Sequence, residues 1–183
     1  MDFLLNYGLM QLLYSFAMNI TSSDEMLKYR LLLFLSIPTN IAMQILSTSG
    51  LRFIFKDTQQ RKKKLELFHI STFTPTFFLV IAVGLLGPDL LGIYLGEIWK
   101  EIPALLPAFL AMSITSIFLT HSSMTVKWAN LTQVVFARRV FLSVMQFLVT
   151  SFAISWNGAL GILTSLIVFN VIFMLINLIA IRS

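Results

Sequence analysis

The segment Ala159–Ile181 reads ALGILTSLIVFNVIFMLINLIAI and contains no charged residue. About 20 predominantly apolar residues are enough to cross the hydrocarbon core of a bilayer as a helix. A strand of a membrane β-barrel would instead alternate polar and apolar residues over about 10 positions, and this segment does not. The segment therefore predicts a transmembrane helix.

Five more apolar runs, working outward from this one, approach or reach the same length. We predict spans at residues 3–20, 31–51, 67–86, 102–120, 134–156 and 159–181; only 134–156 carries charges, at Arg138 and Arg139. The 183-residue composition agrees, because 57% of the residues are hydrophobic and only 11% are charged, against about 25% charged in soluble domains. We expect an all-α integral membrane protein in which residues 1–183 form a single bundle of six transmembrane helices.

The basic residues are distributed unevenly between the predicted loops. With a cytoplasmic N-terminus, the outer segments hold Lys28, Arg30 and Lys100. The inner segments hold Arg52, Lys56, Arg61, Lys62, Lys63, Lys64, Lys127, Arg138, Arg139 and Arg182. An excess of Lys and Arg on the cytoplasmic side is typical of multi-pass proteins, so both termini are predicted to be cytoplasmic. The run Arg61–Lys64 would also suit a lipid-headgroup or nucleic-acid patch, but its position beside a span favours topology control.

The segment between the third and fourth spans is neither a span nor a plain loop. Gly87-Pro88 is predicted to end the third helix. Apolar residues then recur at helical spacing across residues 89–101, and Tyr94 and Trp99 suit the headgroup zone. We expect a short amphipathic helix on the outer surface here, with an ordinary loop as the alternative.

Polar residues at helical spacing mark helix faces that turn away from lipid. The strongest stripe lies in the second span and consists of Ser36, Asn40, Gln44 and Ser47. Two amides one turn apart are costly in hydrocarbon unless they pair or face water, so a hydrated cavity and interhelical pairing both remain open for this stripe. Interhelical hydrogen bonding is the simpler reading of the weaker stripes, which are His69, Thr72 and Thr76; Ser113, Ser116 and Thr120; Ser143, Gln146 and Thr150; and Asn170 with Asn177.

Catalytic chemistry has little support in the sequence. The chain has no cysteine, and it lacks an HExxH pair, a GxSxG elbow and a P-loop. Neither His69 nor His121 has a carboxylate cluster nearby that would complete a metal site. We expect no enzyme activity, no metal and no cofactor. His69 is interpreted as a packing or interfacial residue, and His121 as a solvated residue at a membrane exit.

Three passages together resemble the O-antigen and capsular polysaccharide flippases of the multidrug/oligosaccharidyl-lipid/polysaccharide exporter superfamily. They are Tyr29-Arg30-Leu31 leading to Ile37-Pro38, Gly87-Pro88 followed by Leu95-Gly96-Glu97-Ile98-Trp99, and Trp156-Asn-Gly-Ala-Leu-Gly161. The likeness covers roughly residues 23–181. Two departures stand out: Arg30 lies eight residues before Pro38 rather than about five, and six spans match only the C-terminal lobe of a flippase with 12 or more.

The resemblance implies a transporter in the bacterial cytoplasmic (inner) membrane that moves an oligosaccharide linked to polyprenyl pyrophosphate between leaflets. The chain would be a partial or truncated C-terminal half, acting with a separate N-terminal lobe or a second copy, among membrane lipids and without nucleic acid. Candidate residues of the substrate pathway are Arg30, Asn40, Gln44, Arg52 and Gln146; the arginines would meet pyrophosphate or else anchor the helices at the interface. Another exporter of the superfamily and a non-transporting membrane scaffold subunit are the alternatives.

Overall fold

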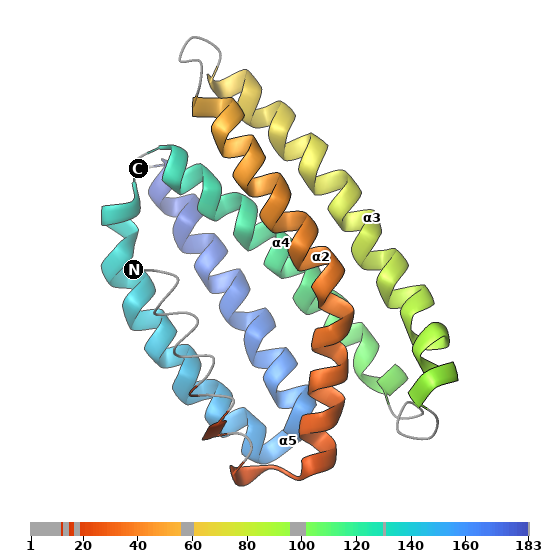
Figure 1. The fold of residues 1–183 in the computed structure, drawn as a ribbon. Coiled ribbons are helices and arrows are strands. Elements are labelled where there is room, and N and C mark those ends of the chain that lie inside the picture. Colours follow the sequence, from red (N-terminus) through yellow and green to blue (C-terminus); the bar gives the residue numbers. More distant parts are fainter. Residues whose placement is uncertain are drawn as a thin grey trace.

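The computed structural model describes residues 19–55, 61–95, 102–129 and 131–182, together with residues 12, 15 and 16. Within these ranges the chain is all-helical and contains no strand, which confirms the predicted all-α class. The helices are α2 (Ser23–Phe55), α3 (Arg61–Leu95), α4 (Leu106–Trp128) and α5 (Thr132–Arg182), as Figure 1 shows. A 3₁₀ turn over residues 102–105 leads into α4. The predicted span 3–20 lies almost entirely outside the described residues.

The longest helix, α5, is folded back on itself into two arms. Asn157 (φ −129°, ψ 16°) and Gly158 (φ 51°, ψ −131°) leave the helical conformation, and the chain reverses direction there (Figure 1). Each arm is about 35 Å long at 1.5 Å per residue, close to the thickness of a bilayer core. The break lies between the predicted spans 134–156 and 159–181.

Two apolar helical stretches among the described residues are long enough to cross a membrane, namely Ile102–Lys127 and Thr132–Arg182. A shorter apolar stretch, Phe73–Leu86, lies within α3. These helices are what a membrane protein requires by length and composition. They do not show six spans, and that arrangement stays a prediction.

Helix α3 continues past the point where the sequence predicts its end. It runs through Gly87 and Pro88 to Leu95, so the prediction that Gly87-Pro88 terminates the third helix is wrong. A proline removes one backbone hydrogen bond and displaces the preceding turn, which bends a helix without necessarily ending it. The last turns of α3 leave the line of the rest of the helix (Figure 1). Of the predicted surface helix, residues 89–95 belong to α3 and residues 96–101 lie outside the described part.

Helix α4 also extends further than the predicted span 102–120, because the polar residues after position 120 continue the helix. It reaches Trp128, and three of its hydroxyl groups near this end donate hydrogen bonds to the helix's own backbone carbonyls. Thr120 donates to the Ser116 carbonyl at 2.9 Å, Ser122 to Leu119 at 2.9 Å, and Thr125 to His121 at 3.1 Å. Hydroxyls that bond back to the preceding turn are tolerated inside a helix, so polarity alone does not end one.

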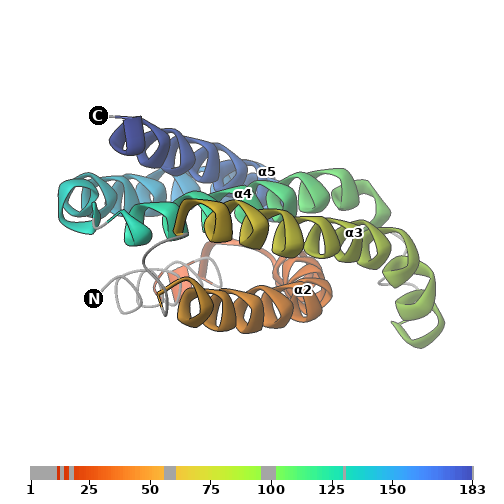
Figure 2. The same cartoon turned by 90° about the horizontal axis from the view of Figure 1, so that it is seen from above.

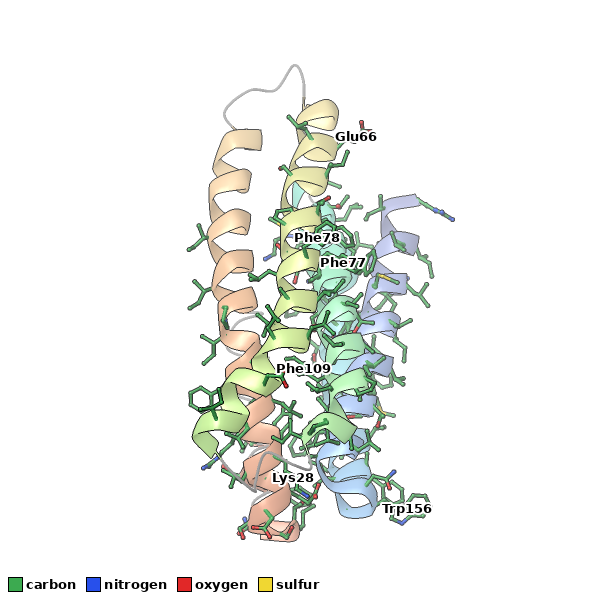
Figure 3. The ribbon with its side chains drawn as sticks, turned by 90° about the vertical axis from the view of Figure 1, so that its right-hand side faces the viewer. Lys28, Glu66, Phe77, Phe78, Phe109 and Trp156 are labelled. Carbon is green, nitrogen blue, oxygen red and sulfur yellow. The ribbon has the colours of Figure 1, made fainter. Side chains whose placement is uncertain are left out.

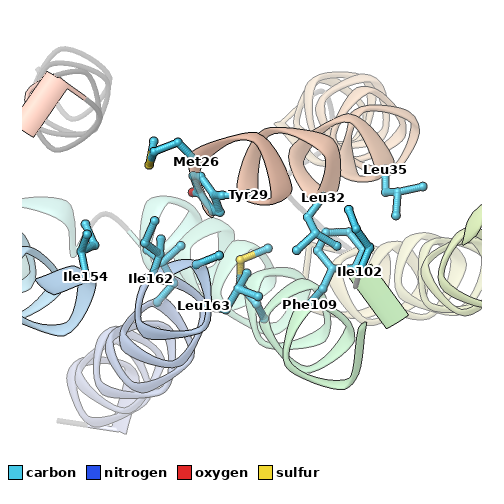
Figure 4. Close-up of a cluster of buried hydrophobic side chains, with 12 residues drawn as sticks. Met26, Tyr29, Leu32, Leu35, Ile102, Phe109, Ile154, Ile162 and Leu163 are labelled. Atoms are coloured by element: carbon cyan, nitrogen blue, oxygen red, sulfur yellow. The ribbon is translucent and has the colours of Figure 1, made fainter. Parts of the chain in front are cut away.

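The helices pack in the order α5, α4, α3, α2 when seen from above (Figure 2). The main apolar cluster joins α2 to α4 and to the turn of α5, and Figure 4 shows it. On α2 its members recur every three residues and form a stripe that winds slowly around the helix: Met26, Tyr29, Leu32 and Leu35. Facing them are Ile102, Phe109, Met112, Ile154, Ala159, Ile162, Leu163 and Leu166. This cluster holds α2 and α4 against the turn of α5, at the end of the bundle where α5 reverses direction.

Two ends of the bundle are distinguished below. The hairpin end holds the start of α2 and the turn of α5, with Lys28 and Trp156; the basic end holds the start of α3, the end of α4 and both termini of α5, with Glu66. Figure 3 shows Lys28 and Trp156 at one end and Glu66 at the other. A second apolar cluster of Val126, Val135 and Ala180 ties α4 and both arms of α5 together at the basic end.

Candidate functional site

A half-buried arginine lies between the two arms of α5 near the basic end. Arg139, on the first arm, donates hydrogen bonds from Nη2 to Asn177 Oδ1 at 2.8 Å and to Ser123 Oγ at 3.3 Å. Asn177, on the second arm, is fully buried. Its amide nitrogen donates to Ser122 Oγ at 2.9 Å and to Ser123 Oγ at 3.2 Å. A guanidinium, an amide and two hydroxyls from three helical segments thus form one network.

The same arrangement recurs two helical turns away. Asn170 lies seven residues before Asn177, and its amide nitrogen donates to Ser116 Oγ at 2.9 Å and Thr115 Oγ1 at 3.3 Å. These two acceptors lie seven residues before Ser123 and Ser122 on α4. The matching spacing shows that α4 and the second arm of α5 keep one register over two turns. Amides on one helix meet hydroxyls on the other at each repeat.

A third polar contact joins the two arms of α5 closer to their turn. Ser165 Oγ donates to Thr150 Oγ1 at 2.9 Å, and both side chains are buried. We call the whole set the polar seam, which consists of Arg139, Thr150, Ser165, Asn170, Asn177, Thr115, Ser116, Ser122 and Ser123. The seam runs through the interior of otherwise apolar helices and ends at a cation near the basic end.

The seam bears out part of the expectation drawn from polar stripes. Asn170, Asn177, Ser116 and Thr150 were read as interhelical hydrogen-bonding residues, and each forms such a bond. Ser113 also turns inward, yet its buried hydroxyl has no hydrogen-bond partner. Helical spacing therefore identified the inward faces, but it did not identify which polar groups would meet.

The predicted substrate-pathway residues are not gathered at this seam. Arg30 is exposed on α2 near the hairpin end, whereas Arg139 lies toward the basic end. Gln146 is half-buried on the first arm of α5 and takes no part in the bonds of the seam. The side chains of Asn40, Gln44 and Arg52 lie outside the described residues, as does that of His69.

The inward placement of Arg139 is not predicted from the sequence, where this residue counts only as a charge of the cytoplasmic side. A signal for its inward placement was present. Arg139 lies four residues from both Val135 and Ser143, which are buried on the first arm together with Thr150. Residues spaced by four share a helix face, so extending the stripe of Ser143 and Thr150 back by one turn reaches Arg139.

His121 also differs from its predicted setting. It was expected to be solvated at a membrane exit, but only 8% of its surface is exposed. Its ring lies edge-on to Phe73 of α3, with centroids 5.7 Å apart. The extension of α4 beyond residue 120 buries it, because the residue lies within the helix instead of in a loop.

The hairpin end contains a separate electrostatic contact. Glu25 Oε2 accepts a hydrogen bond from the backbone N–H of Ala159 at 3.0 Å, and Oε1 accepts one from Lys28 Nζ at 2.7 Å. Ala159 begins the second arm of α5, whose unpaired N–H groups favour a carboxylate. The Lys28 hydrogen bond is the main cause that holds the pKa of Glu25 below its ordinary value, and the Ala159 bond adds to it against some desolvation.

Comparison with protein-family models, with curated proteins and with solved structures finds no match to this chain. Within the described ranges there is also no group of three His, Cys, Asp or Glu residues that could hold a metal ion. The chemistry available at the polar seam is accordingly that of one guanidinium, amides and hydroxyls, which recognise anions and sugar hydroxyls.

Proposed function

We propose that the chain is a multi-pass protein of a bacterial cytoplasmic membrane and forms one lobe of a carrier for oligosaccharides linked to polyprenyl pyrophosphate. The single observation that carries this proposal is the half-buried Arg139, held by Asn177 and Ser123 among apolar helices. A charge within apolar helices is expensive and marks substrate pathways in membrane proteins. The class of cargo is taken from the sequence resemblance. No covalent chemistry is required of the chain.

The outward face of α5 supports a membrane location. On the first arm the large apolar residues Phe141, Phe152 and Trp156 are 65%, 65% and 79% exposed. Water-soluble proteins rarely expose large contiguous apolar surfaces, whereas a bilayer solvates them. In the proposed topology the arms of α5 are the last two of six spans, both termini are cytoplasmic, and the basic end faces the cytoplasm.

The polar seam supplies groups suited to the proposed cargo. A guanidinium matches phosphate in charge and in the geometry of its N–H donors. Asn170 and Asn177 lie along the same helix face and could exchange their bonds to Ser116 and Ser122 for bonds to sugar hydroxyls. In this proposal a second lobe supplies the opposite wall, because a transport groove needs two walls that open alternately to each side.

Adjacent arginines provide a matched test. Arg138 is exposed while Arg139 is half-buried in the seam, so Arg138→Gln and Arg139→Gln remove the same charge from two environments. The full chain in nanodiscs should bind a polyprenyl pyrophosphate oligosaccharide more tightly than the matching polyprenyl alcohol. Arg139→Gln should weaken that binding at least about tenfold, since a desolvated ionic hydrogen bond is lost. Arg138→Gln should change it less than about twofold.

Equal binding of the pyrophosphate and the alcohol, or equal effects of the two substitutions, would contradict the proposal. Those results would instead favour a second candidate, a scaffold subunit that assembles other membrane proteins. One observation favours this candidate: Asn177 already bonds Arg139 through its oxygen and Ser122 and Ser123 through its nitrogen, as a packing residue would. A scaffold should also co-purify with partner proteins and lose them when Asn177 is replaced.

A further inference from the structure

An apolar groove lies between α3, α4 and the second arm of α5, toward the basic end. It has a volume of about 410 Å³. Its walls are mainly Ile70, Phe73, Phe118, His121, Met174 and Leu178. Ile70 is 66% exposed, Phe118 44% and Leu178 40%, so the groove opens to the outside of the bundle. Apolar walls on an open face favour an apolar, chain-like occupant.

A basic residue, Arg182, lies just beyond the groove on the helix face of α5 that forms one of its walls. Met174, Leu178 and Arg182 are spaced by four residues along α5, so Arg182 lies on the same helix face one turn beyond the groove. Lys127 and Arg138 are exposed at the same end, where Val126, Val135 and Ala180 pack together. Among the described residues of this end, the carboxylate is Glu66 on α3, one turn before Ile70. Arg182 therefore lies at the mouth of the groove, at an end of the bundle where the exposed cations of the described residues outnumber the carboxylate.

We propose that this groove binds an anionic glycerophospholipid, with one acyl chain along the groove and the phosphate at Arg182. Basic residues at the cytoplasmic end of an interhelical groove are the features that recognise anionic headgroups. The apolar walls match an acyl chain, and the charge at the mouth discriminates against lipids without net charge. The site requires the bundle to lie in a bilayer, but it does not require the carrier function, because Arg139, Asn170 and Asn177 do not line the groove; Ser122 is the one residue of the polar seam that does.

Native mass spectrometry of the full chain in mild detergent measures the occupancy directly. The probes are dioleoyl phosphatidylglycerol and dioleoyl phosphatidylcholine, which have the same acyl chains and differ in net charge. Phosphatidylglycerol should bind more tightly. Arg182→Gln should weaken its binding about fivefold, the contribution of one basic residue near an anionic headgroup, and should leave phosphatidylcholine unchanged.

Three further variants distinguish the contributions of the groove walls, of the charges at the groove mouth and of the net charge of the chain to lipid binding. Thr74→Trp, at an exposed position of the groove wall, should reduce the binding of both lipids by filling the groove. Glu66→Gln removes the opposing charge and should strengthen phosphatidylglycerol binding. Lys28→Gln makes the same charge change as Arg182→Gln at the hairpin end and should leave binding unaltered. Circular dichroism confirms that each variant is folded before its binding is measured.

Equal affinity for the two lipids would overturn the proposal. So would an Arg182→Gln effect matched by Lys28→Gln, or unaltered binding in folded Thr74→Trp. Because the probes carry neither a sugar nor a polyprenyl chain, failure here leaves the carrier proposal untested by this experiment, and failure of polyprenyl pyrophosphate binding leaves this groove in place.

Discussion

Arg139 and Asn177 lie 38 positions apart in the chain, yet the guanidinium of the first donates a 2.8 Å hydrogen bond to the amide oxygen of the second. The bond joins the two arms of α5, and Ser123 of α4 accepts a second bond from the same nitrogen. A charged group in apolar surroundings is stable only while its hydrogen-bonding capacity is met. The contact therefore sets both the packing of α5 and the position of the one cation in the polar seam.

Replacing Asn177 with Leu should destabilise the chain by about 1–3 kcal/mol, because the Arg139 guanidinium loses its shorter hydrogen bond and the hydroxyls of Ser122 and Ser123 lose a donor. Thermal unfolding in detergent measures the change. Asn170→Leu is the matched control, since it removes an amide from the same face whose hydrogen bonds go to hydroxyls and not to a charged group. An Asn170→Leu variant that is at least as unstable as Asn177→Leu would show that the Arg139 contact adds nothing.

Gly158 should tolerate no side chain. Its φ of 51° with ψ of −131° is a conformation that L residues rarely adopt, and a Cβ there would lie 2.5 Å from Glu25 Oε2. We expect Gly158→Ala to cost about 1–3 kcal/mol of stability, measured by thermal unfolding. The neighbouring Asn157 has a φ of −129° and is exposed, so Asn157→Ala should be nearly neutral. Similar losses in both variants would argue against strain at Gly158.

The Glu25 contact should make stability depend on pH. Because the folded chain lowers the pKa of Glu25 below its ordinary value of 4.5, the unfolded chain takes up the proton first as the pH falls. The contribution is thus complete above pH 4.5 and is lost as the pH falls through the lower, folded pKa. The unfolding temperature of the natural sequence should exceed that of Glu25→Gln at pH 7, and the difference should shrink toward about pH 3. A constant difference across this range would contradict the linkage.

The helices were predictable because long apolar runs and helical spacing of polar residues are local features of the sequence. The turn between the arms of α5 was predictable for the same reason, since Asn157-Gly158 interrupts an otherwise continuous apolar stretch. The ends of α3 and α4 were not, because α3 continues through Pro88 to Leu95, and the hydroxyl of Thr125 bonds to its own helix. Local polarity does not reveal whether a backbone continues.

The partners of polar residues could not be read from the sequence. Arg139 meets Asn177 only because α5 reverses and α4 runs alongside both arms, which is a property of the tertiary packing. The burial of His121 against Phe73 has the same origin, since the two residues belong to different helices. Spacing indicates which face of a helix is inward, whereas contacts across helices depend on register and crossing geometry.

Cysteines placed at Thr58 and Ser155 should be labelled by an impermeant thiol reagent from opposite sides of the membrane. Ser155 lies exposed beside the turn of α5 at the hairpin end, and Thr58 follows Phe55, where α2 ends at the opposite end of the bundle. The 33 residues of α2 extend about 50 Å, which exceeds the thickness of a bilayer core. The chain has no natural cysteine, so no background labelling is expected. Labelling of both sites from one side would refute the proposed topology.

If the proposed function holds, the isolated chain should not move lipid-linked sugar by itself, because a single lobe would supply only one wall of the transport groove. In a lone lobe the predicted stripe of Asn40 and Gln44 would face lipid. Leaving the two amides without hydrogen bonds in hydrocarbon would cost roughly a few kcal/mol of stability in total. Asn40→Leu and Gln44→Leu should therefore raise the thermal stability of the isolated chain, whereas the neighbouring exposed Ile41→Leu should not. In an intact two-lobe relative the corresponding amide substitutions should lower surface polysaccharide. If the isolated 183 residues are monomeric and restore surface polysaccharide in a flippase-deficient strain, a second lobe is unnecessary and the single-wall argument fails.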